Sequence, residues 1–516
     1  MQTANDLLAQ PFATMPDLVR AHALERPDHP AIIDGAQVVT FSELDAQIDR
    51  AAAALQRDGV KSRDTVAICG PSSIAYVTIF VAALRAGAAA CPLAPSSTAE
   101  QLSMMVRDCG ASLAFVDDAA SIALESGTDP APGIRISLEG QLNTPFAHWL
   151  APKGARPAPL EIDPDQPFNI IYSSGTTGTP KGIVQPHKMR WGHVRRAEAL
   201  GYDTTAITIV STPLYSNTTL VSLIPALMRG GTVVLMRKFD ARGFLELSQK
   251  HRATHAMLVP VQYRRLMDLP DFETFDLSNY RMKTCTSAPF PADLKADVLK
   301  RWPGGLVEIY GMTEGGGSCL LRAHEFPHKL HTVGQPAPGH DVRIIGESGE
   351  QLPQGQTGEI VGRSMSIMTG YHNQPGKTAE AEWQSPQGER FIRTGDIGRF
   401  DEDGFLVLGD RKKDMIITGG FNVYPSDLEA ELAKHPSVTE SAVVGVPSRE
   451  WGETPAAFLV LREGAAETAD DIKTWLNARV GKTQRLTYAV VVDSLPRSSI
   501  GKVLKRQLRD EFRPTT

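Results

Sequence analysis

Apolar positions in the first part of the chain alternate between helical spacing and short continuous runs. Residues 42–58 carry apolar side chains at helical spacing, which predicts a helix with Ser42 as its N-cap. The stretch 73–86 predicts a second, buried helix, and the runs 65–69 and 112–116 predict short buried strands. Helices that alternate with strands in this way favour α/β layers built on parallel sheets.

The same alternation resumes after residues 126–166, a stretch rich in Pro, Gly and Asp that we interpret as a surface connection. The strands expected beyond it are 168–172, 207–211, 232–236 and 256–259. The pattern changes between 340 and 410, where short strands separated by glycine turns predict a β-rich subdomain.

From Asp410 onward the pattern indicates a separate small unit. Its expected elements are a helix over 426–434, a strand over 441–446, a helix over 469–479 and a strand over 488–493. We therefore expect an α/β protein with a large N-terminal domain, 1–410, of layered α/β subdomains and the β-rich subdomain. A small, mobile α+β C-terminal domain, 411–516, would follow a hinge at about 410–413.

Composition narrows the class of protein. The 516 residues include 53 basic and 59 acidic side chains, and the resulting net charge of −6 favours neither nucleic acid nor an anionic membrane. The five cysteines are scattered and form no CxxC pair, which argues against a disulfide framework and a cysteine zinc site. With no signal pattern and no uninterrupted apolar stretch of membrane-spanning length, we expect a cytoplasmic globular protein without a transmembrane segment.

The densest chemical signal is a loop directly after the apolar strand 168–172. It reads Tyr172-Ser173-Ser174-Gly175-Thr176-Thr177-Gly178-Thr179-Pro180-Lys181-Gly182. Glycines let the backbone approach a phosphate, hydroxyls donate hydrogen bonds and the lysine supplies positive charge. The Walker A pattern fails, because Pro180 and Gly182 flank Lys181. A polar surface turn is the plain alternative.

The loop resembles the signature of the ANL superfamily, which comprises acyl-CoA synthetases, peptide-synthetase adenylation domains and firefly-type luciferases. Further motifs of that family follow in order: Glu308-Ile309-Tyr310-Gly311-Met312-Thr313-Glu314, Arg393-Thr394-Gly395-Asp396, Asp410-Arg411-Lys412-Lys413-Asp414 with Gly419-Gly420, and Pro496-Arg497-Ser498-Ser499-Ile500-Gly501-Lys502. The resemblance spans about residues 30–510 and is strongest to acyl-CoA synthetases, including bacterial aryl- or 4-coumarate-type CoA ligases.

The resemblance implies that ATP and AMP are bound by four segments. Their residues are Ser173, Ser174, Gly175, Thr176, Thr177 and Gly178; Ser287, Ala288 and Pro289; Glu308, Ile309, Tyr310, Gly311 and Thr313; and Asp396 with Arg411. Tyr310 would offer a flat face to adenine. Asp396 would accept the ribose hydroxyl protons, a role suited to an ionised carboxylate.

The resemblance implies that four residues take part in the adenylation reaction. Glu314 is similar to the family's magnesium-associated glutamate, and a carboxylate is a hard oxygen ligand suited to a phosphate-bridging Mg²⁺. Thr313 would donate to the α-phosphate, and Lys181 belongs to the triphosphate loop. Lys502 would stabilise charge at the junction of carboxylate and phosphate. The family's second step implies rotation of the small domain about Lys413.

A thiol tunnel and an acyl pocket complete the implied site. Gly419, Gly420, Phe421 and Trp451 match the positions that meet coenzyme A, and paired glycines would keep the passage open. The acyl pocket is expected at Tyr215, Ser216, Asn217, Gly315 and Gly316. The glycines leave depth for a long or flat acid, or else simply form a turn.

The segment 213–219, called the acyl segment below, also bears on which acid is the substrate. Ser216 stands where many family members carry a histidine, and no aspartate is nearby to pair an α-ammonium group, which argues against amino acids. Hydroxycinnamate-like acids and medium- or long-chain fatty acids both fit, with a lean to the former. His187, just beyond the phosphate loop, either borders the acyl site or is structural.

These residues predict an ATP-dependent carboxylic acid–CoA ligase. It would form acyl-AMP and pyrophosphate with ATP and Mg²⁺, and then the acyl-CoA thioester. Two alternatives remain: a freestanding enzyme that loads an acyl carrier protein, and a non-catalytic nucleotide-binding sensor. The expected partners are a small carboxylic acid, ATP and CoA, without nucleic acid, and a homodimer is left open.

Overall fold

The computed structural model describes residues 2–126, 133–173, 180–411, 414–418, 421–448, 452–481, 484–498 and 501–512. The chain divides into two compact units. The first consists of Met1–Asp341 with Gly362–Ile392, and the second of Val342–Val361 with Arg393–Thr516. The domain bounds expected from the sequence, with a hinge at 410–413, stay a prediction.

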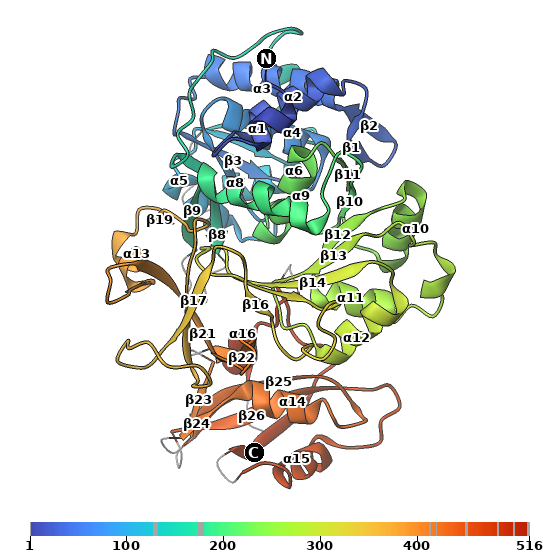
Figure 1. Cartoon of the computed structure of the whole chain (residues 1–516), viewed down its shortest axis with the longest axis vertical. Coiled ribbons are helices and arrows are strands. Elements are labelled where there is room, and N and C mark those ends of the chain that lie inside the picture. Colours follow the sequence, from blue (N-terminus) through green and yellow to red (C-terminus); the bar gives the residue numbers. More distant parts are fainter. Residues whose placement is uncertain are drawn as a thin grey trace. The chain divides into compact units, whose positions relative to one another are not determined.

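A nine-stranded sheet forms one layer of the first unit (Figure 1). Its order is β16(Gln335–Pro336)-β15(Cys319–Arg322)-β14(Gly305–Tyr310)-β13(Met282–Cys285)-β12(His255–Leu258)-β10(Ile207–Val210)-β11(Thr232–Leu235)-β1(Pro30–Asp34)-β2(Gln37–Thr40). The strands from β14 to β1 pair in parallel, and the antiparallel pairs are confined to the two ends. Short, fully buried apolar strands are what a parallel sheet covered on both faces requires.

An eight-stranded sheet forms the other layer. Its order is β19(Gly370–Tyr371)-β9(Lys181–Pro186)-β8(Pro167–Ser173)-β4(Ala89–Pro92)-β3(Thr65–Cys69)-β5(Leu113–Val116)-β6(Ile134–Ser137)-β7(Thr144–Pro145). The strands from β8 to β7 pair in parallel, whereas β8 and β9 form an antiparallel pair. This pair brings the residues on either side of the loop 174–179 next to each other.

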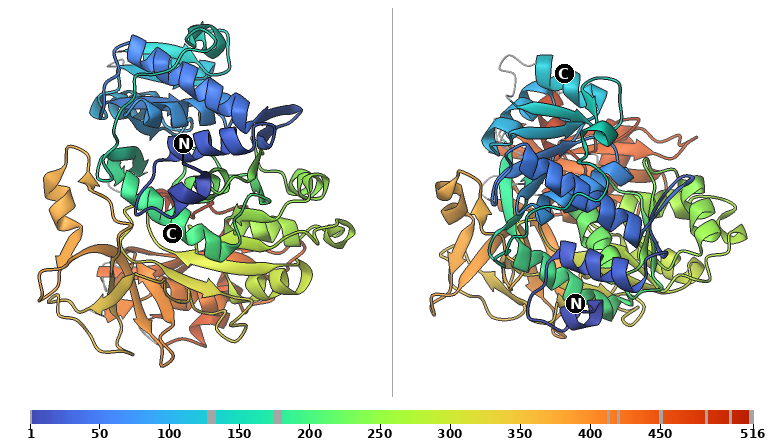
Figure 2. Two further views of the ribbon diagram at one scale, coloured as in Figure 1. Left: turned by 45° about the horizontal axis from the view of Figure 1, so that its top comes forward. Right: turned by 90° about the horizontal axis from the view of Figure 1, so that it is seen from above.

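Helices cover these sheets. Those of the first unit are α1(Ala4–Leu8), α2(Met15–Glu25), α3(Phe41–Arg57), α4(Ile74–Arg85), α5(Ala99–Asp108), α6(Asp118–Ser126), α7(Phe146–Trp149), α8(His187–Arg196), α9(Asn217–Met228), α10(Ala241–His251), α11(Pro260–Met267), α12(Ala292–Arg301) and α13(Pro375–Glu380), with the 3-10 turns Ala197–Leu200 and Phe272–Thr274. Figure 2 shows the blue helices of the N-terminal part packed side by side. The fold is the layered α/β architecture that the sequence predicts.

One helix start differs from its prediction. The helix expected over 42–58 is α3, but its N-cap is Thr40 and not Ser42. Thr40 Oγ1 accepts the backbone N–H of Glu43, and the Glu43 carboxylate accepts the N–H of Thr40. This reciprocal capping box satisfies two otherwise unpaired donors, which Ser42 inside the first turn does not do.

The expected β-rich subdomain is present as a five-stranded sheet. Its order is β17(Asp341–Ile345)-β18(Gly358–Arg363)-β21(Arg390–Phe400)-β20(Glu382–Gln384), and β22(Leu406–Arg411) pairs with β21. The register places Asp396 of β21 opposite Arg411 of β22.

The remaining part of the second unit is an α+β structure with its own core. Its sheet has the order β24(Phe421–Val423)-β23(Ile416–Thr418)-β26(Gly452–Leu461)-β25(Val438–Ser448), with β27(Tyr488–Val491) beside β26. Helices α14(Pro425–Leu432), α15(Ala469–Asn477) and α16(Lys505–Glu511) belong to it. The buried residues include Ile416, Leu428, Leu459 and Ile472. No helix in the described part of the chain is long and apolar enough to cross a membrane.

Candidate active site

Strand β9 begins at Lys181, immediately after the glycine-rich loop. Its ammonium nitrogen lies 5.0 Å from the centre of the Tyr371 ring, within the range of a cation–π contact. The Tyr371 hydroxyl in turn donates to Glu314 Oε1 at 2.8 Å. Lys181 and Glu314, 133 positions apart, are thus joined through Tyr371, which the sequence analysis missed because it lies outside every motif.

Tyr371 is suited to hold this carboxylate in place. Burial and the charge of Glu314 both raise the pKa of its phenol, so the hydroxyl keeps its proton and stays a donor. Of the described residues, Tyr371 is the hydrogen-bond partner of the Glu314 carboxylate through Oε1. If Glu314 holds Mg²⁺, as its motif implies, its second oxygen would be the one left for the metal, which prefers hard oxygen ligands. The described residues include no group of three or more potential metal ligands.

Gln185 on β9 connects two predicted parts of the site. Its amide nitrogen donates to the backbone oxygen of Thr313 at 2.6 Å, and it lies 3.4 Å from Oδ1 of Asn217. Thr313 belongs to the adenylate motif, and Asn217 opens α9 in the predicted acyl segment. The side chain of Gln185 is fully buried. A single amide therefore ties the adenylate motif to the acyl segment.

A buried arginine fixes the orientation of that amide. Arg190 on α8 donates through Nε and Nη2 to Asn169 Oδ1, at 3.1 and 3.0 Å, and through Nη2 to Gln185 Oε1. Asn169 Nδ2 donates to the same Gln185 oxygen at 2.9 Å. Because guanidinium carries only donors, Gln185 must present its oxygen to Arg190 and its NH₂ group to Thr313.

Arg190 is unusual in its own surroundings. It is 1% exposed, and among the described residues it forms no ion pair with a carboxylate. Burial lowers the pKa of its guanidinium to about 9, and the group lies 5.9 Å from the centre of the Phe168 ring. A buried cation without an anion is costly, so the network of neutral oxygens around Arg190 is what holds it.

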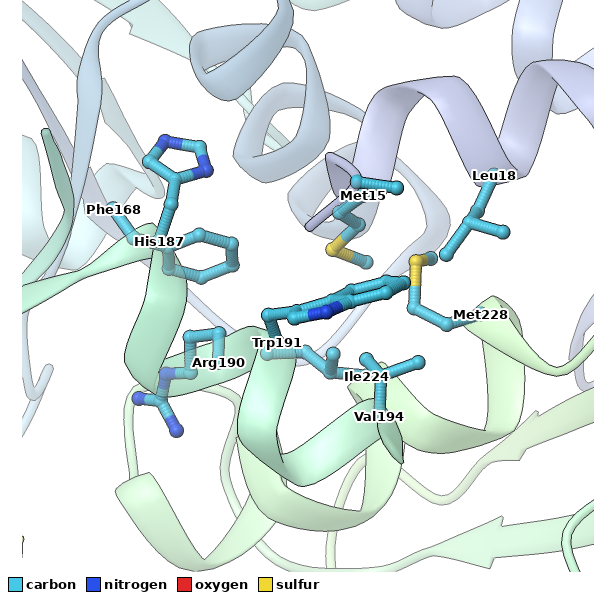
Figure 3. A pocket seen from close by; sticks show the side chains of 10 residues that line it. Met15, Leu18, Phe168, His187, Arg190, Trp191, Val194, Ile224 and Met228 are labelled. Carbon is cyan, nitrogen blue, oxygen red and sulfur yellow. The ribbon is translucent and has the colours of Figure 1, made fainter. Parts of the chain in front are cut away.

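The same helix carries His187, which packs in the core. Its ring is 3% exposed and makes edge contacts with Phe12 and Phe168. It lines a cavity of about 10 Å³, together with Trp191, whose ring lies among Met15, Ile224 and Met228 in Figure 3. That volume is about the space for one water molecule. Burial lowers the pKa of His187 to about 4. This packing favours the structural interpretation of His187.

The acyl segment and the segment 287–289 are in direct contact. The hydroxyl oxygens of Thr218 and Ser287 lie 2.6 Å apart. Ser287 has a φ of 82°, a left-handed conformation that is uncommon for residues other than glycine and often marks a functional site. Ser216 is the N-cap of α9, and Tyr215 before it is half-buried. Ala288 is half-buried and Pro289 is exposed.

Glu308 lies differently from the other residues of its motif. Its carboxylate is 4% exposed and forms a buried ion pair with Lys295 of α12. Burial raises the pKa of Glu308 to about 7 despite the ammonium beside it. Lys295 also donates to the backbone oxygens of Leu330 and Thr332. A role of Glu308 in nucleotide binding would therefore be played by its backbone. The next residues, Ile309 and Tyr310, are half-buried at the end of β14, and Gly311 is exposed.

Backbone packing explains why positions 315 and 316 are occupied by glycine. Both have positive φ, and a Cβ at Gly315 would overlap the carbonyl oxygen of Ser366. A Cβ at Gly316 would lie 2.6 Å from the carbonyl oxygen of Gly362. The N–H of Gly316 donates to Ser366 at 2.8 Å. The close approach of two backbone segments explains why side chains are absent here; a role in the acyl pocket stays a prediction.

In the second unit, the residues predicted to hold the ribose are neighbours. Asp396 and Arg411 face each other in the β21–β22 register. The N–H of Asp396 donates to Thr394 Oγ1 at 3.0 Å, and Thr394 donates to Ile360 O at 2.9 Å. The backbone of Asp396 is thereby anchored to the sheet.

Lys502 lies shortly before α16 in the second unit and is hydrogen-bonded to Ser498. Ser498 and Lys502 pair through Ser498 N–H to Lys502 O at 2.8 Å and Lys502 N–H to Ser498 Oγ at 3.2 Å. Arg497 braces the turn by donating to Gly501 O at 2.7 Å and pairing with Glu440 at 2.7 Å. Lys502 is half-buried, and Gly501 has a φ of 78°.

Several predicted residues cannot be placed. Ser174, Gly175, Thr176, Thr177, Gly178, Lys413, Gly419, Gly420 and Trp451 lie outside the described residues. The backbone of Ser173 ends β8, and that of Phe421 begins β24. Their predicted roles in phosphate binding, hinge motion and CoA binding stay predictions.

Comparison with known proteins gives the family. The description "AMP-binding enzyme" matches residues 19–372, and "AMP-binding enzyme C-terminal domain" matches residues 427–502. A feruloyl-CoA synthase from an Amycolatopsis species is 33% identical over 94% of this chain and 96% of its own. The fatty acid–[acyl-carrier-protein] ligase ScoC of Streptomyces coeruleorubidus is 32% identical over 95% of both chains. The ATP-bound structure of MatB from Rhodopseudomonas palustris has a TM-score of 0.86 at 29% identity, covering 96% of this chain and 99% of that one.

The two-unit α/β fold and these matches define an adenylate-forming ligase. The chain belongs to the AMP-binding enzyme family of the ANL superfamily and is an AMP-forming acyl-CoA synthetase. ATP, Mg²⁺ and CoA are the cofactor and co-substrates of this class.

Proposed function

We propose that this enzyme activates an aromatic, hydroxycinnamate-like carboxylic acid and transfers it to coenzyme A. The observation that carries the proposal is the hydrogen bond of Gln185 to Thr313, because the same amide reaches Asn217. Acid and nucleotide must be held in one geometry for the carboxylate to attack the α-phosphate. The similarity to a feruloyl-CoA synthase over nearly the whole chain supports an aromatic acid.

Each residue has a task in this proposal. Lys181 offsets phosphate charge, and Tyr371 holds one oxygen of Glu314, leaving the other oxygen for the metal. Mg²⁺, when bound, would screen the phosphates from the incoming carboxylate. Thr313, whose backbone oxygen is held by Gln185, would donate to the α-phosphate. Lys502 adds positive charge during adenylation, and Asp396 with Arg411 holds the ribose.

The second half-reaction needs a different arrangement. We propose that the small domain turns about Lys413, so that Lys502 leaves and Gly419, Gly420, Phe421 and Trp451 meet the pantetheine chain. The acyl group would then pass from AMP to the thiol. We further propose that the enzyme works in the cytoplasm, and a homodimer stays a prediction that light scattering would test.

The decisive assay is pyrophosphate release from ATP and Mg²⁺ across a panel of carboxylic acids, each with and without CoA. Turnover on cinnamates that depends on CoA supports the proposal. A single burst that CoA does not convert into turnover would favour a carrier-protein acceptor, an alternative that the similarity to ScoC raises. No release with any acid would contradict the proposal and favour a nucleotide sensor.

A further inference from the structure

The two ends of the glycine-rich loop are neighbours in the antiparallel pair of β8 and β9. The register places Tyr172 opposite Gly182, and Ser173 opposite Lys181. A Cβ at Gly182 would lie 3.2 Å from Cε1 of Tyr172 and 3.1 Å from Cβ of His372. Glycine at position 182 therefore lets the Tyr172 ring and the segment after β19 lie close to the start of β9.

Strand β19 and the residue after it hold the end that follows the loop. β19 pairs with β9, and the N–H of His372 donates to the carbonyl oxygen of Gly182 at 2.7 Å. The Tyr371 ring contacts the Lys181 ammonium, and its hydroxyl donates to Glu314. This segment therefore contacts both residues that are proposed to act on the phosphates and the metal.

Asp108, the last residue of α5, connects this segment with the end that precedes the loop. Its carboxylate Oδ2 accepts the Tyr172 hydroxyl at 2.5 Å. Its backbone oxygen accepts Nδ2 of Asn373 at 3.2 Å, across 265 positions of sequence. Tyr172 precedes the loop, and Asn373 follows Tyr371 by two residues. Tyr172, Asp108 and Asn373 are called the Asp108 network below.

The residue types in the Asp108 network suit these contacts. Burial raises the pKa of the Tyr172 phenol, so the hydroxyl keeps its proton and stays a donor. A hydroxyl that donates to a carboxylate forms a charge-assisted bond, which is stronger than a neutral one. Asn373 has a φ of 53°, a left-handed conformation that asparagine adopts more readily than most residues. Asp108 and Asn373 lie outside every motif that the sequence analysis singled out.

We propose that the Asp108 network positions Lys181 and Glu314 for the binding of MgATP. It acts through Tyr371, because it fixes the segment that carries this ring against β8 and β9. The inference rests on the proposed function, which assigns the phosphates to Lys181 and the metal to Glu314. It adds that the support for MgATP binding extends to the end of α5, among residues that contact neither the nucleotide nor the acid.

The test compares two nucleotides in the intact enzyme. The Kd values of MgATP and AMP are measured by titration calorimetry without acid or CoA. We expect Tyr172→Phe to raise the Kd of MgATP about tenfold, the usual effect of losing one hydrogen bond to a charged group. The Kd of AMP should stay unchanged, because AMP lacks the β- and γ-phosphates and does not need this metal. A purely structural role would weaken both nucleotides alike.

A second variant tests the other hydrogen bond of the network. Asn373→Asp keeps the tolerance for a left-handed conformation and loses the N–H donor toward the Asp108 oxygen. It should raise the Kd of MgATP in the same selective way. Because Asn373 is exposed, this variant should fold even where Tyr172→Phe does not.

Tyr280→Phe is the matched control. It also removes a phenol hydroxyl, which lies 2.8 Å from the Ser248 hydroxyl of α10, and it should leave both Kd values unchanged. An unchanged Kd of MgATP in normally folded Tyr172→Phe and Asn373→Asp enzymes would overturn the inference, and so would equal weakening of MgATP and AMP.

Lys181→Met tests the proposed function separately. If this variant leaves MgATP binding unchanged, the assignment of Lys181 to the phosphates fails, and the inference fails with it. If Lys181→Met weakens MgATP whereas the variants of the Asp108 network do not, the inference alone fails and the proposed function stands.

Discussion

The amide nitrogen of Gln185 donates to the backbone oxygen of Thr313 at 2.6 Å, across 128 positions of sequence. Gln185 follows the phosphate loop by only a few residues, and Thr313 belongs to the adenylate motif. The bond links strand β9 to the adenylate motif, and Arg190 fixes which way the amide points. We therefore expect Gln185 to act as a positioning residue for the adenylate motif.

The variant Gln185→Glu tests this positioning role. Glutamate keeps an oxygen for Arg190 and gains an ion pair, so the fold should remain stable. It loses the N–H donor toward Thr313, and we expect pyrophosphate exchange to slow about tenfold, the effect of about 1.4 kcal/mol in the barrier. Thermal unfolding and exchange are measured on the same sample. Wild-type exchange in a normally folded Gln185→Glu enzyme would contradict the role.

The matching variant Arg190→Met probes the other end of the network. It leaves Asn169 Oδ1 without its donor and takes one of two donors from Gln185 Oε1, which should destabilise the protein by about 1–3 kcal/mol. Urea unfolding gives this value. Because the Gln185 amide can then flip, exchange should fall as well; unchanged stability would show that Arg190 does not hold the network.

Tyr371→Phe tests how Glu314 is held. The change removes the hydroxyl that donates to Glu314 Oε1 and leaves the ring for Lys181. We expect the Mg²⁺ concentration for half-maximal pyrophosphate release to rise several-fold, because a loosened carboxylate is a poorer ligand. Saturating Mg²⁺ should restore most of the rate. A Mg²⁺ dependence identical to that of the wild type would mean that the phenol has no part in placing Glu314.

Lys502→Ala separates the two half-reactions. Formation of acyl-AMP should fall by about 100-fold or more, since the proposed role of Lys502 is to stabilise negative charge in the transition state. Thioester formation from supplied acyl-AMP should continue. Lys505→Ala is the control, because that side chain pairs with Glu429 at 2.8 Å on α14. Equal loss in both half-reactions would refute the alternation of the small domain.

The buried pair of Glu308 and Lys295 predicts a pH dependence of stability. The pKa of Glu308 is raised from 4.5 to about 7 in the folded state, so the native protein binds this proton more tightly than the unfolded chain does. The contribution of Glu308 is fully present below pH 4.5 and is lost as the pH rises through 7. Relative to Glu308→Gln, the wild type should lose stability between these values. Urea unfolding at pH 5 and pH 8 measures the difference, and parallel curves would count against the raised pKa.

Local patterns made most of the fold predictable. The α/β alternation and the change to short strands after 340 follow from the periodicity of apolar side chains, which depends only on residues close together in the sequence. The start of α3 was misplaced by two positions because Ser42 and Thr40 are both good caps, and only Glu43 decides between them. The glycines at 315 and 316 could leave depth in a pocket or form a turn, and the sequence did not show that the backbone of Ser366 and Gly362 packs against them.

The site was predictable only where its residues belong to contiguous motifs. Tyr371 meets Glu314 across 57 positions, and Gln185 meets Thr313 across 128. Such contacts depend on how the two sheets pack, and one sequence carries no local signal for them. Arg190 is a partial exception, because it stands between Met189 and Trp191, and a charged residue between apolar neighbours in a helix can indicate a buried polar network. The residues of the loop 174–178 and the glycine pair at 419–420 remain predictions from their motifs.

The most direct test of the account is the product balance with one acid. Enzyme, ATP, Mg²⁺, CoA and a cinnamate acid that the panel shows to be turned over are incubated, and AMP, pyrophosphate and thioester are quantified by mass spectrometry and chromatography. The account predicts the three products in equal amounts, with acyl-AMP accumulating when CoA is left out. Formation of ADP and phosphate, or of AMP and pyrophosphate without thioester, would contradict an AMP-forming acid–CoA ligase.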